Sequence, residues 1–172
     1  MYKLVLSPRR YSAILHASSV LDSGTVMMII ANGMEEDSPY KFCLEAMTVQ
    51  RKFELEKAHK IFGVKQLYTM NQSVYHLDYD LITLKLQLLL AVSPFTHFYF
   101  MNNGDQRLFQ ICQSVNTNAK KLVYKPKGKV SWVHTLNEKE IERKLNAIER
   151  MTTVRKELLA YDLTTEYVQR YL

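Results

Sequence analysis

The stretch QRKFELEKAHKIFGV, residues 50–64, decides the fold prediction. It is a run of good helix formers that stops at Gly63, a residue that ends helices because it readily adopts the left-handed backbone conformation. Strand-forming residues follow at once in residues 64–70. The stretch therefore predicts a helix, beginning near residue 39 and ending near Phe62, that leads directly into a strand. The apolar stripe expected on this helix consists of Phe42, Ala46, Val49 and Phe53.

The same alternation of strand and helix runs along the whole chain. Several strand-like segments are apolar almost throughout, which is typical of parallel strands covered by helices on both faces. The predicted fold class is α/β, a three-layer α/β/α sandwich with a mostly parallel, Rossmann-like sheet and right-handed crossovers. The chain is expected to form a single domain, residues 1–172. The expected strands are residues 2–6, 25–31, 64–70, 95–101 and 120–124.

The remaining helices are predicted from apolar spacing and caps. Residues 81–90 and 106–115 read as helices, and residues 125–129 read as a turn. A later helix starts after Asn137, which has Glu140 three positions on, as in a capping box. Its expected core face consists of Ile141, Leu145, Ile148, Met151, Val154 and Leu158. The tail, residues 161–172, is expected to form a final helix carrying Tyr167 and Tyr171.

Composition places the chain among globular proteins. It has 47% hydrophobic and 23% charged residues in 172, and no apolar run approaches the roughly 20 residues that cross a bilayer. The first residues lack the pattern of a secretory signal, so we expect a cytoplasmic protein, or one of the host cytoplasm if it is viral. Cys43 and Cys112 are far apart in apolar contexts and are expected to be free thiols.

The net charge of +6 favours acidic partners. Much of the excess lies between Lys120 and Lys129. That segment is either a nucleic-acid-facing loop or a solvated hairpin, and the sequence supports the nucleic-acid reading only weakly.

Two helical segments resemble one family. The similarity lies in the helix pattern R-x-x-E-x-x-x-A-x-x-x-x-G-V, in the strand that ends before Gly33 and in the later pattern K-x-x-A-I. The chain thereby resembles the PIG-L/LmbE family, whose members are zinc-dependent deacetylases of N-acetylglucosamine-containing substrates. This resemblance implies a PIG-L/LmbE-like fold over most of the chain. The residues that carry it are Arg51, Glu54, Ala58, Gly63, Val64, Lys144, Ala147 and Ile148.

The reactive residues of that family are missing. Its P-H-P-D-D-E motif supplies zinc ligands and the general base, but residues 8–13 here read PRRYSA. A guanidinium can neither ligate a cation nor accept a proton. The family's D-H pair has become Asp105-Gln106, and its late histidine falls near Met151. The resemblance therefore implies no catalytic residue, no metal ligand and no cofactor, although zinc is expected in the family. The five histidines show no metal-binding spacing either.

The altered motif suggests an anion site. Arg9 and Arg10 begin a helix, where positive charge is unfavourable, so an acidic group should offset them. One hypothesis is an internal ion pair with Asp105. The other is a bound anion, such as the phosphate of a nucleotide or sugar, with Arg9, Arg10, Asp105 and Arg51 as candidate ligand-binding residues.

Three functions remain open. The first is a pseudoenzyme, a catalytically inactive deacetylase-like protein acting as an interaction or structural subunit with a protein partner or in a larger assembly. The second is a divergent metal-dependent deacetylase or hydrolase of N-acetylglucosamine-type conjugates. The third is a binding module for a phosphorylated ligand or nucleic acid. None of them requires a membrane.

Overall fold

A seven-stranded sheet forms the centre of the computed structural model, which describes residues 2–31, 44–64, 66–73, 75–125 and 130–170, with the backbone alone for residues 44–48. The strand order is β3-β2-β1-β4-β5-β7-β6. The first five of these strands run parallel, and β7 pairs antiparallel with both β5 and β6. This confirms the predicted α/β class with a mostly parallel sheet.

The strands and helices alternate along the chain. The strands are β1 (Lys3–Arg9), β2 (Thr25–Ala31), β3 (Gln66–Gln72), β4 (His97–Met101), β5 (Lys120–Lys125), β6 (Trp132–Thr135) and β7 (Thr165–Arg170). The helices are α1 (Ser12–His16), the short 3-10 helix η1 (Ser18–Val20), α2 (Leu44–Ile61), α3 (Tyr79–Val92), α4 (Gln106–Ser114), α5 (Glu138–Glu149) and α6 (Arg155–Leu158). The expected turn at residues 125–129 lies largely outside the described residues.

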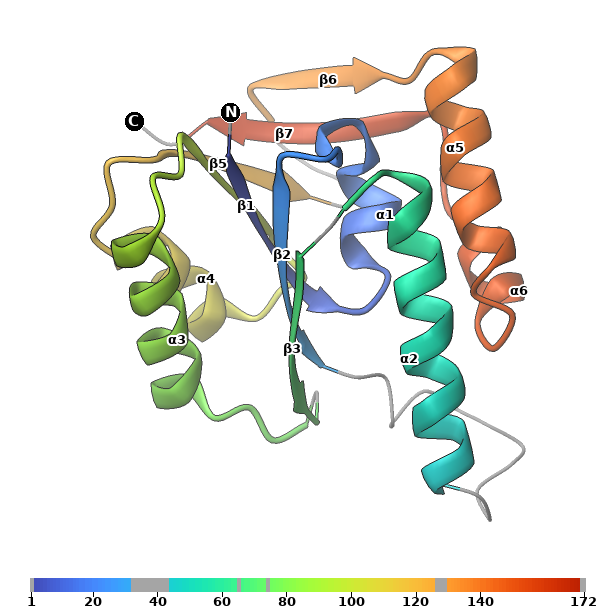
Figure 1. Ribbon diagram of the computed structural model, residues 1–172. Coiled ribbons are helices and arrows are strands. Elements are labelled where there is room, and N and C mark those ends of the chain that lie inside the picture. Colours follow the sequence, from blue (N-terminus) through green and yellow to red (C-terminus); the bar gives the residue numbers. More distant parts are fainter. Residues whose placement is uncertain (1, 32–43, 65, 74, 126–129, 171–172) are drawn as a thin grey trace.

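Helices cover both faces of the sheet. Figure 1 shows α3 and α4 on one face, and α1, α2 and α5 on the other. Residues of β1 alternate between the two layers, with Val5 in the α1–α2 core and Leu4 and Leu6 in the α3–α4 core. No described helix is both long enough and apolar enough to cross a membrane.

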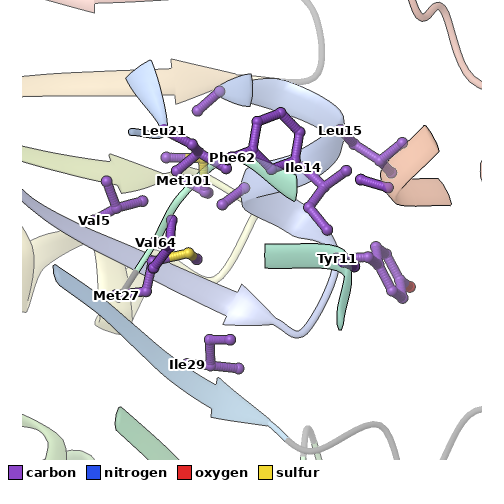
Figure 2. Close-up of a cluster of buried hydrophobic side chains, with 14 of the residues drawn as sticks. Val5, Tyr11, Ile14, Leu15, Leu21, Met27, Ile29, Phe62, Val64 and Met101 are labelled. Atoms are coloured by element: carbon purple, nitrogen blue, oxygen red, sulfur yellow. The ribbon is translucent and has the colours of Figure 1, made fainter. Parts of the chain in front are cut away.

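The larger core lies between the sheet and α1, α2 and α5. Figure 2 shows Ile14 and Leu15 of α1 and Phe62, at the end of α2, gathered over Val5 and Met27 of the sheet. Helix α1 has only five residues, four of them buried, so its position depends on this packing rather than on helix propensity. The turn that precedes α1 is thereby fixed against the core.

Helix α2 buries a different face from the one predicted. Val49 is 69% exposed and Phe53 is 56% exposed. Arg51 and Glu54 are each only 4% exposed and lie on the inner face with Leu55, Ala58 and His59. The apolar stripe was placed wrongly because two of the buried side chains are charged. Phe42 and Ala46 fall outside the described side chains, and so does the predicted helix start at residue 39.

The end of α2 agrees with the prediction. Gly63 has a φ of 80°, the left-handed conformation that few other residues adopt without strain. The amide of Gly63 bonds to the carbonyl of Lys60, and the amide of Val64 bonds to that of His59. The chain then enters β3.

The C-terminal third differs from the prediction in two places. Asn137 and Glu140 form the expected capping box, but α5 ends at Glu149, and Met151 and Val154 reach the core from a turn. Leu145, predicted to face the core, is 37% exposed. Residues 165–170 form strand β7 instead of the expected final helix.

Candidate functional site

The turn after β1 lies at the edge of the sheet where parallel strands present their carboxyl ends. Ligands commonly bind at that edge in open α/β sheets. The Ser7 hydroxyl organises the turn, because it donates to the carbonyl of Arg9 at 2.6 Å and accepts from the amide of Ala13 at 3.1 Å. These two bonds fold the chain back into α1 and place Arg9 and Arg10 at the corner.

Arg10 is the central side chain of this region. It is only 1% exposed, which is unusual for a charged residue. Its Nη1 lies 3.1 Å from Oε2 of Glu54 on α2, and its Nη2 donates to Oγ1 of Thr153 at 2.7 Å. The guanidinium therefore points inward and joins the β1–α1 turn to α2 and to the turn after α5.

The Glu54 carboxylate is surrounded by further donors. It accepts from the Thr152 hydroxyl, from the Thr153 amide at 3.2 Å and from the Thr153 hydroxyl at 2.7 Å. Gln50 adds a fourth contact at 3.3 Å. Burial alone raises the pKa of Glu54, but the hydrogen bonds from both threonines and Arg10, with the charge of Arg10, bring it below its usual value. The carboxylate is therefore ionised at neutral pH and paired.

Two of the predicted site residues are arranged differently. Arg9 is exposed, and its Nη1 donates to the Tyr11 hydroxyl at 2.9 Å. Asp105 caps α4 by accepting from the Leu108 amide at 2.9 Å, and it accepts from the Tyr79 hydroxyl at 3.0 Å. Among the described residues, no ion pair joins Arg9 to Asp105. The expected internal partner of the arginines is wrong, because Glu54 pairs with Arg10 and Asp105 serves as a helix cap.

Arg51, the fourth predicted residue, lies one turn before Glu54 on the same buried face of α2. The structure thus brings Arg10 and the α2 face together but does not bring Asp105 to them. Binding of an anion by these residues stays a prediction. Sequence reasoning missed Thr152 and Thr153, although they adjoin Met151, the position that the resemblance had singled out.

The residues at the end of β1 do not fit a zinc ion. Zinc takes neutral imidazole, thiolate or carboxylate donors. Arg10 supplies none, and both oxygens of Glu54 already accept hydrogen bonds. Within the described part of the chain, no three His, Cys, Asp or Glu residues are grouped so that they could hold a metal.

Histidines are also absent from this corner in the described residues. His59 is fully buried on α2, where its Nδ1–H donates to the Leu55 carbonyl at 2.8 Å. Burial lowers the pKa of His59 to about 4, and the pKa of His16 is lowered to about 4 by burial and by the charge of Lys144. Both imidazoles are therefore neutral at pH 7, and the contacts of His59 are those of a core residue.

Known structures share this fold although known sequences do not match. No family model and no curated protein matches the amino-acid sequence. An N,N'-diacetylchitobiose deacetylase from Pyrococcus horikoshii superposes with a TM-score of 0.75 at 12% identity, over 99% of this chain and 83% of that chain. A conserved protein from Thermus thermophilus gives 0.73 at 13% identity, over 99% and 94%. The fold is PIG-L/LmbE-like.

The same fold also serves a different reaction. The 4-carboxy-2-hydroxymuconate hydratase GalB from Pseudomonas putida superposes with a TM-score of 0.72 at 12% identity, over 100% of this chain and 97% of that chain. A PIG-L/LmbE-like fold therefore does not by itself specify deacetylation, and function has to be argued from the site.

The signature positions of the PIG-L/LmbE-like fold are buried here. Arg51, Glu54 and Ala58 lie on the inner face of α2, and Lys144 lies fully buried on α5. The Nζ of Lys144 is 3.6 Å from Oε1 of Glu166 on β7. Burial lowers the pKa of Lys144, although the carboxylate of Glu166 opposes that shift.

A second buried polar cluster therefore forms away from the Arg10 corner. Glu166 accepts from the amide and hydroxyl of Ser18, at 2.6 and 2.7 Å, and from the Ser19 hydroxyl. The cluster ties β7 to η1 and α5. Its polar atoms face one another in the interior, so we interpret it as structural.

Proposed function

We propose that the chain is a catalytically inactive PIG-L/LmbE-like protein that acts as an interaction or structural subunit. One observation carries the proposal: in residues 8–13, which stand where the resemblance places the P-H-P-D-D-E motif, Arg10 is buried and ion-paired with Glu54. The fold likeness supports the deacetylase-like scaffold, and the side chains at this corner support the loss of its chemistry.

The chemical argument concerns what hydrolysis needs. Removing an acetyl group requires an activated water, a base to take its proton and donors for the developing oxyanion. Arg10 cannot act as a base at any ordinary pH. The Glu54 carboxylate pairs with Arg10, its lowered pKa makes it a poor base, and both of its oxygens accept hydrogen bonds. Neither residue can activate water while the pair is intact.

The test is metal content together with turnover. The protein would be expressed with added zinc, dialysed against metal-free buffer and analysed by mass spectrometry for metals. It would then be incubated with N,N'-diacetylchitobiose and other N-acetylglucosamine conjugates, and free amine would be measured. We expect well under 0.1 equivalent of zinc and no amine above the level of a heat-denatured control. About one equivalent of retained zinc, or amine release abolished by a chelator, contradicts the proposal.

The same assay decides the second candidate, a divergent metal-dependent deacetylase. The observation that favours it is the likeness to the diacetylchitobiose deacetylase at a TM-score of 0.75. Chelator-sensitive turnover that survives Arg10→Met would support this candidate, because the activity would then use ligands away from the Arg10 corner.

The exposed position of Arg9 favours a third candidate, binding of an anion at this edge of the sheet. Inorganic phosphate and a nucleoside triphosphate are suitable probes for calorimetry at low and high salt. Binding that weakens with salt and is lost in Arg9→Ala, but not in Lys139→Ala, an exposed lysine at the opposite end of α5 from the Thr153 turn, would support it. Failure to bind either probe at millimolar concentration would remove this candidate.

A further inference from the structure

Strand β3 lies at one edge of the sheet and is poorly protected there. Among the strands of the described residues, β2 is its one neighbour in the sheet. Residues 66–72, QLYTMNQ, contain no charge and no proline, the two features with which proteins commonly prevent edge strands from pairing with other chains. The register with β2 is regular from Gln66 to Thr69, and an irregularity is confined to the far end, where Asn71 has a φ of 53°. Most of the strand is therefore able to pair.

Helix α3 beside this edge carries two apolar stripes, separated on one side by Asp80, Thr83 and Gln87. Its sequence, YDLITLKLQLLLAV, has one stripe in the core: Ile82, Leu86 and Leu90. A second stripe faces outward and consists of Leu81, Leu84, Leu88 and Val92, which are 37%, 54%, 55% and 74% exposed. A surface helix normally has a single apolar stripe, which faces the core, and polar residues on its outer side. The outward stripe therefore indicates a surface that is covered in the functional state.

The strand and the helix together form one surface, which we call the β3–α3 face. A cavity of about 260 Å³ lies between them. Met28, Tyr68 and Met70 line it from the sheet, and Lys85, Leu88 and Val92 line it from the helix. Tyr68 is 47% exposed. The groove is continuous with the edge of β3, so a strand added there would lie beside the outward stripe of α3.

The exposed area of this face is in the range of an interface. Four aliphatic side chains and Tyr68 are each more than a third exposed, which amounts to roughly 400 Å² if large side chains offer about 150–250 Å² each. Isolated patches of this size commonly mark interaction sites. A stable contact buries about 800 Å² on each partner, so the remainder would come from the β3 backbone and the polar rim.

The composition of the face selects its partner. The chain carries a net charge of +6, but among the described residues that line the groove Lys85 alone is charged, and its flexible stem allows the ammonium group to reach solvent. Two copies can therefore meet at this face without the repulsion that the rest of the surface would cause. An acidic partner would find a single cation here, so charge gives it little preference for this face.

Symmetry also favours a second copy. Two identical edge strands can pair antiparallel about a twofold axis perpendicular to the sheet. Such an axis maps each face of the sheet onto itself, so both α3 helices would flank the seam on the same side and bring their outward stripes together. The other edge strand, β6, has only four residues and offers a much shorter ladder.

We propose that two copies of this chain associate through the β3–α3 face, with their β3 strands paired antiparallel and their α3 stripes packed over the seam. This proposal is independent of the proposed loss of catalysis, because the β3–α3 face would pair in the same way whether or not the chain hydrolyses a substrate.

The first experiment measures mass in solution. Light scattering and sedimentation equilibrium from about 1 to 100 µM would compare the wild type with Leu84→Glu/Leu88→Glu. Both positions are exposed, so the fold should tolerate the charges. We expect the wild type at twice the 20.2 kDa chain mass and the variant at the chain mass, with a dissociation constant raised at least 100-fold. Leu159→Glu, on a residue that is 45% exposed near α6, is the matched control and should stay dimeric.

The second experiment tests the strand pairing by itself. Amide hydrogen exchange of residues 66–72 should slow as the protein concentration rises through the dissociation constant, and it should not slow in the Leu84→Glu/Leu88→Glu variant. A wild type that is monomeric at 100 µM overturns the proposal, as does a dimer that the double variant leaves intact. Growth beyond a dimer, or β3 amides that exchange equally fast at all concentrations, excludes the closed antiparallel seam.

Discussion

Replacing Arg10 by methionine would test how much the buried ion pair between Arg10 and Glu54 contributes to stability. Methionine keeps much of the stem but removes the charge, the bond to Glu54 and the bond to Thr153. Glu54 would then be buried with only neutral donors, and taking up a proton is the change that costs the least free energy. Protonating a carboxyl of ordinary pKa 4.5 at pH 7 costs about 3 kcal/mol, and the lost bond to Thr153 adds about 1 kcal/mol.

We therefore expect Arg10→Met to lower the free energy of unfolding by about 3–4 kcal/mol at pH 7, in the range for broken buried pairs. The loss should shrink to about 1–2 kcal/mol near pH 5, because protonation is then nearly free. Adding Glu54→Gln to Arg10→Met should restore about 2 kcal/mol at pH 7, since no buried charge remains.

Urea unfolding followed by circular dichroism at pH 5 and 7 would measure these values. The control is Arg155→Met, which breaks an exposed contact of 3.8 Å with Glu149 and should change stability by at most about 0.5 kcal/mol. An Arg10→Met loss under 1 kcal/mol at pH 7, or one that does not change with pH, would refute the reasoning.

Three further predictions concern single residues. The pKa of His59 is about 4 in the folded protein against 6.5 in the unfolded chain, so the unfolded chain takes up the proton first as the pH falls. The free energy of unfolding should therefore decrease by about 3 kcal/mol on this account between pH 6.5 and pH 4. His59→Leu should remove this contribution to the pH dependence, as measured by urea titrations across the same pH range. Asn137→Ala breaks the capping box with Glu140 and should cost about 1 kcal/mol, seen as a lower thermal midpoint, whereas an unchanged midpoint speaks against the cap. Gly63→Ala should cost about 1 kcal/mol from its φ of 80°, because an added methyl group would meet Ser23 at ordinary van der Waals distance, 3.6 Å from its backbone nitrogen; a loss above 3 kcal/mol would point to a clash instead.

Residues close together in the sequence were sufficient to predict most of the strands and several helix ends. The strand at Thr25–Ala31 is fully buried and apolar throughout, so a parallel central strand was predictable from composition. Gly63 and the Asn137 box also acted locally, since their bonds lie within a few residues. These features depend on the chain near them and not on distant contacts.

The errors at α2 and at β7 share one cause, which is a charged residue in the interior. Because Arg51 and Glu54 are charged, the inner face of α2 does not look apolar in the sequence. Because Glu166 is charged yet buried, the alternation of apolar and polar residues that is typical of a strand is broken in β7. The two glutamates are tolerated because of partners far along the chain, Thr153 for Glu54 and Ser18 for Glu166. A single sequence does not reveal such partners.

The candidate site was predicted only in part. The burial of Arg10 follows from Glu54, which is 44 positions away, and the resemblance had pointed to the region but not to this pair. Asp105 was expected beside Arg9 because the family resemblance implied that geometry, yet its side chain caps its own helix. Neighbouring strand ends bring backbones together, whereas local capping bonds decide where a short side chain points.

The position of β7 in the sheet has a consequence for synthesis on the ribosome. β7 is the last strand in the sequence, yet it lies between β5 and β6. While the nascent chain emerges, β6 has no ladder to join and the flank of β5 stays open until residues 165–170 leave the exit tunnel. Sheet closure therefore waits for residues 165–170, and we expect ribosome-bound chains stalled before residue 165 to recruit holding chaperones at the β5 flank.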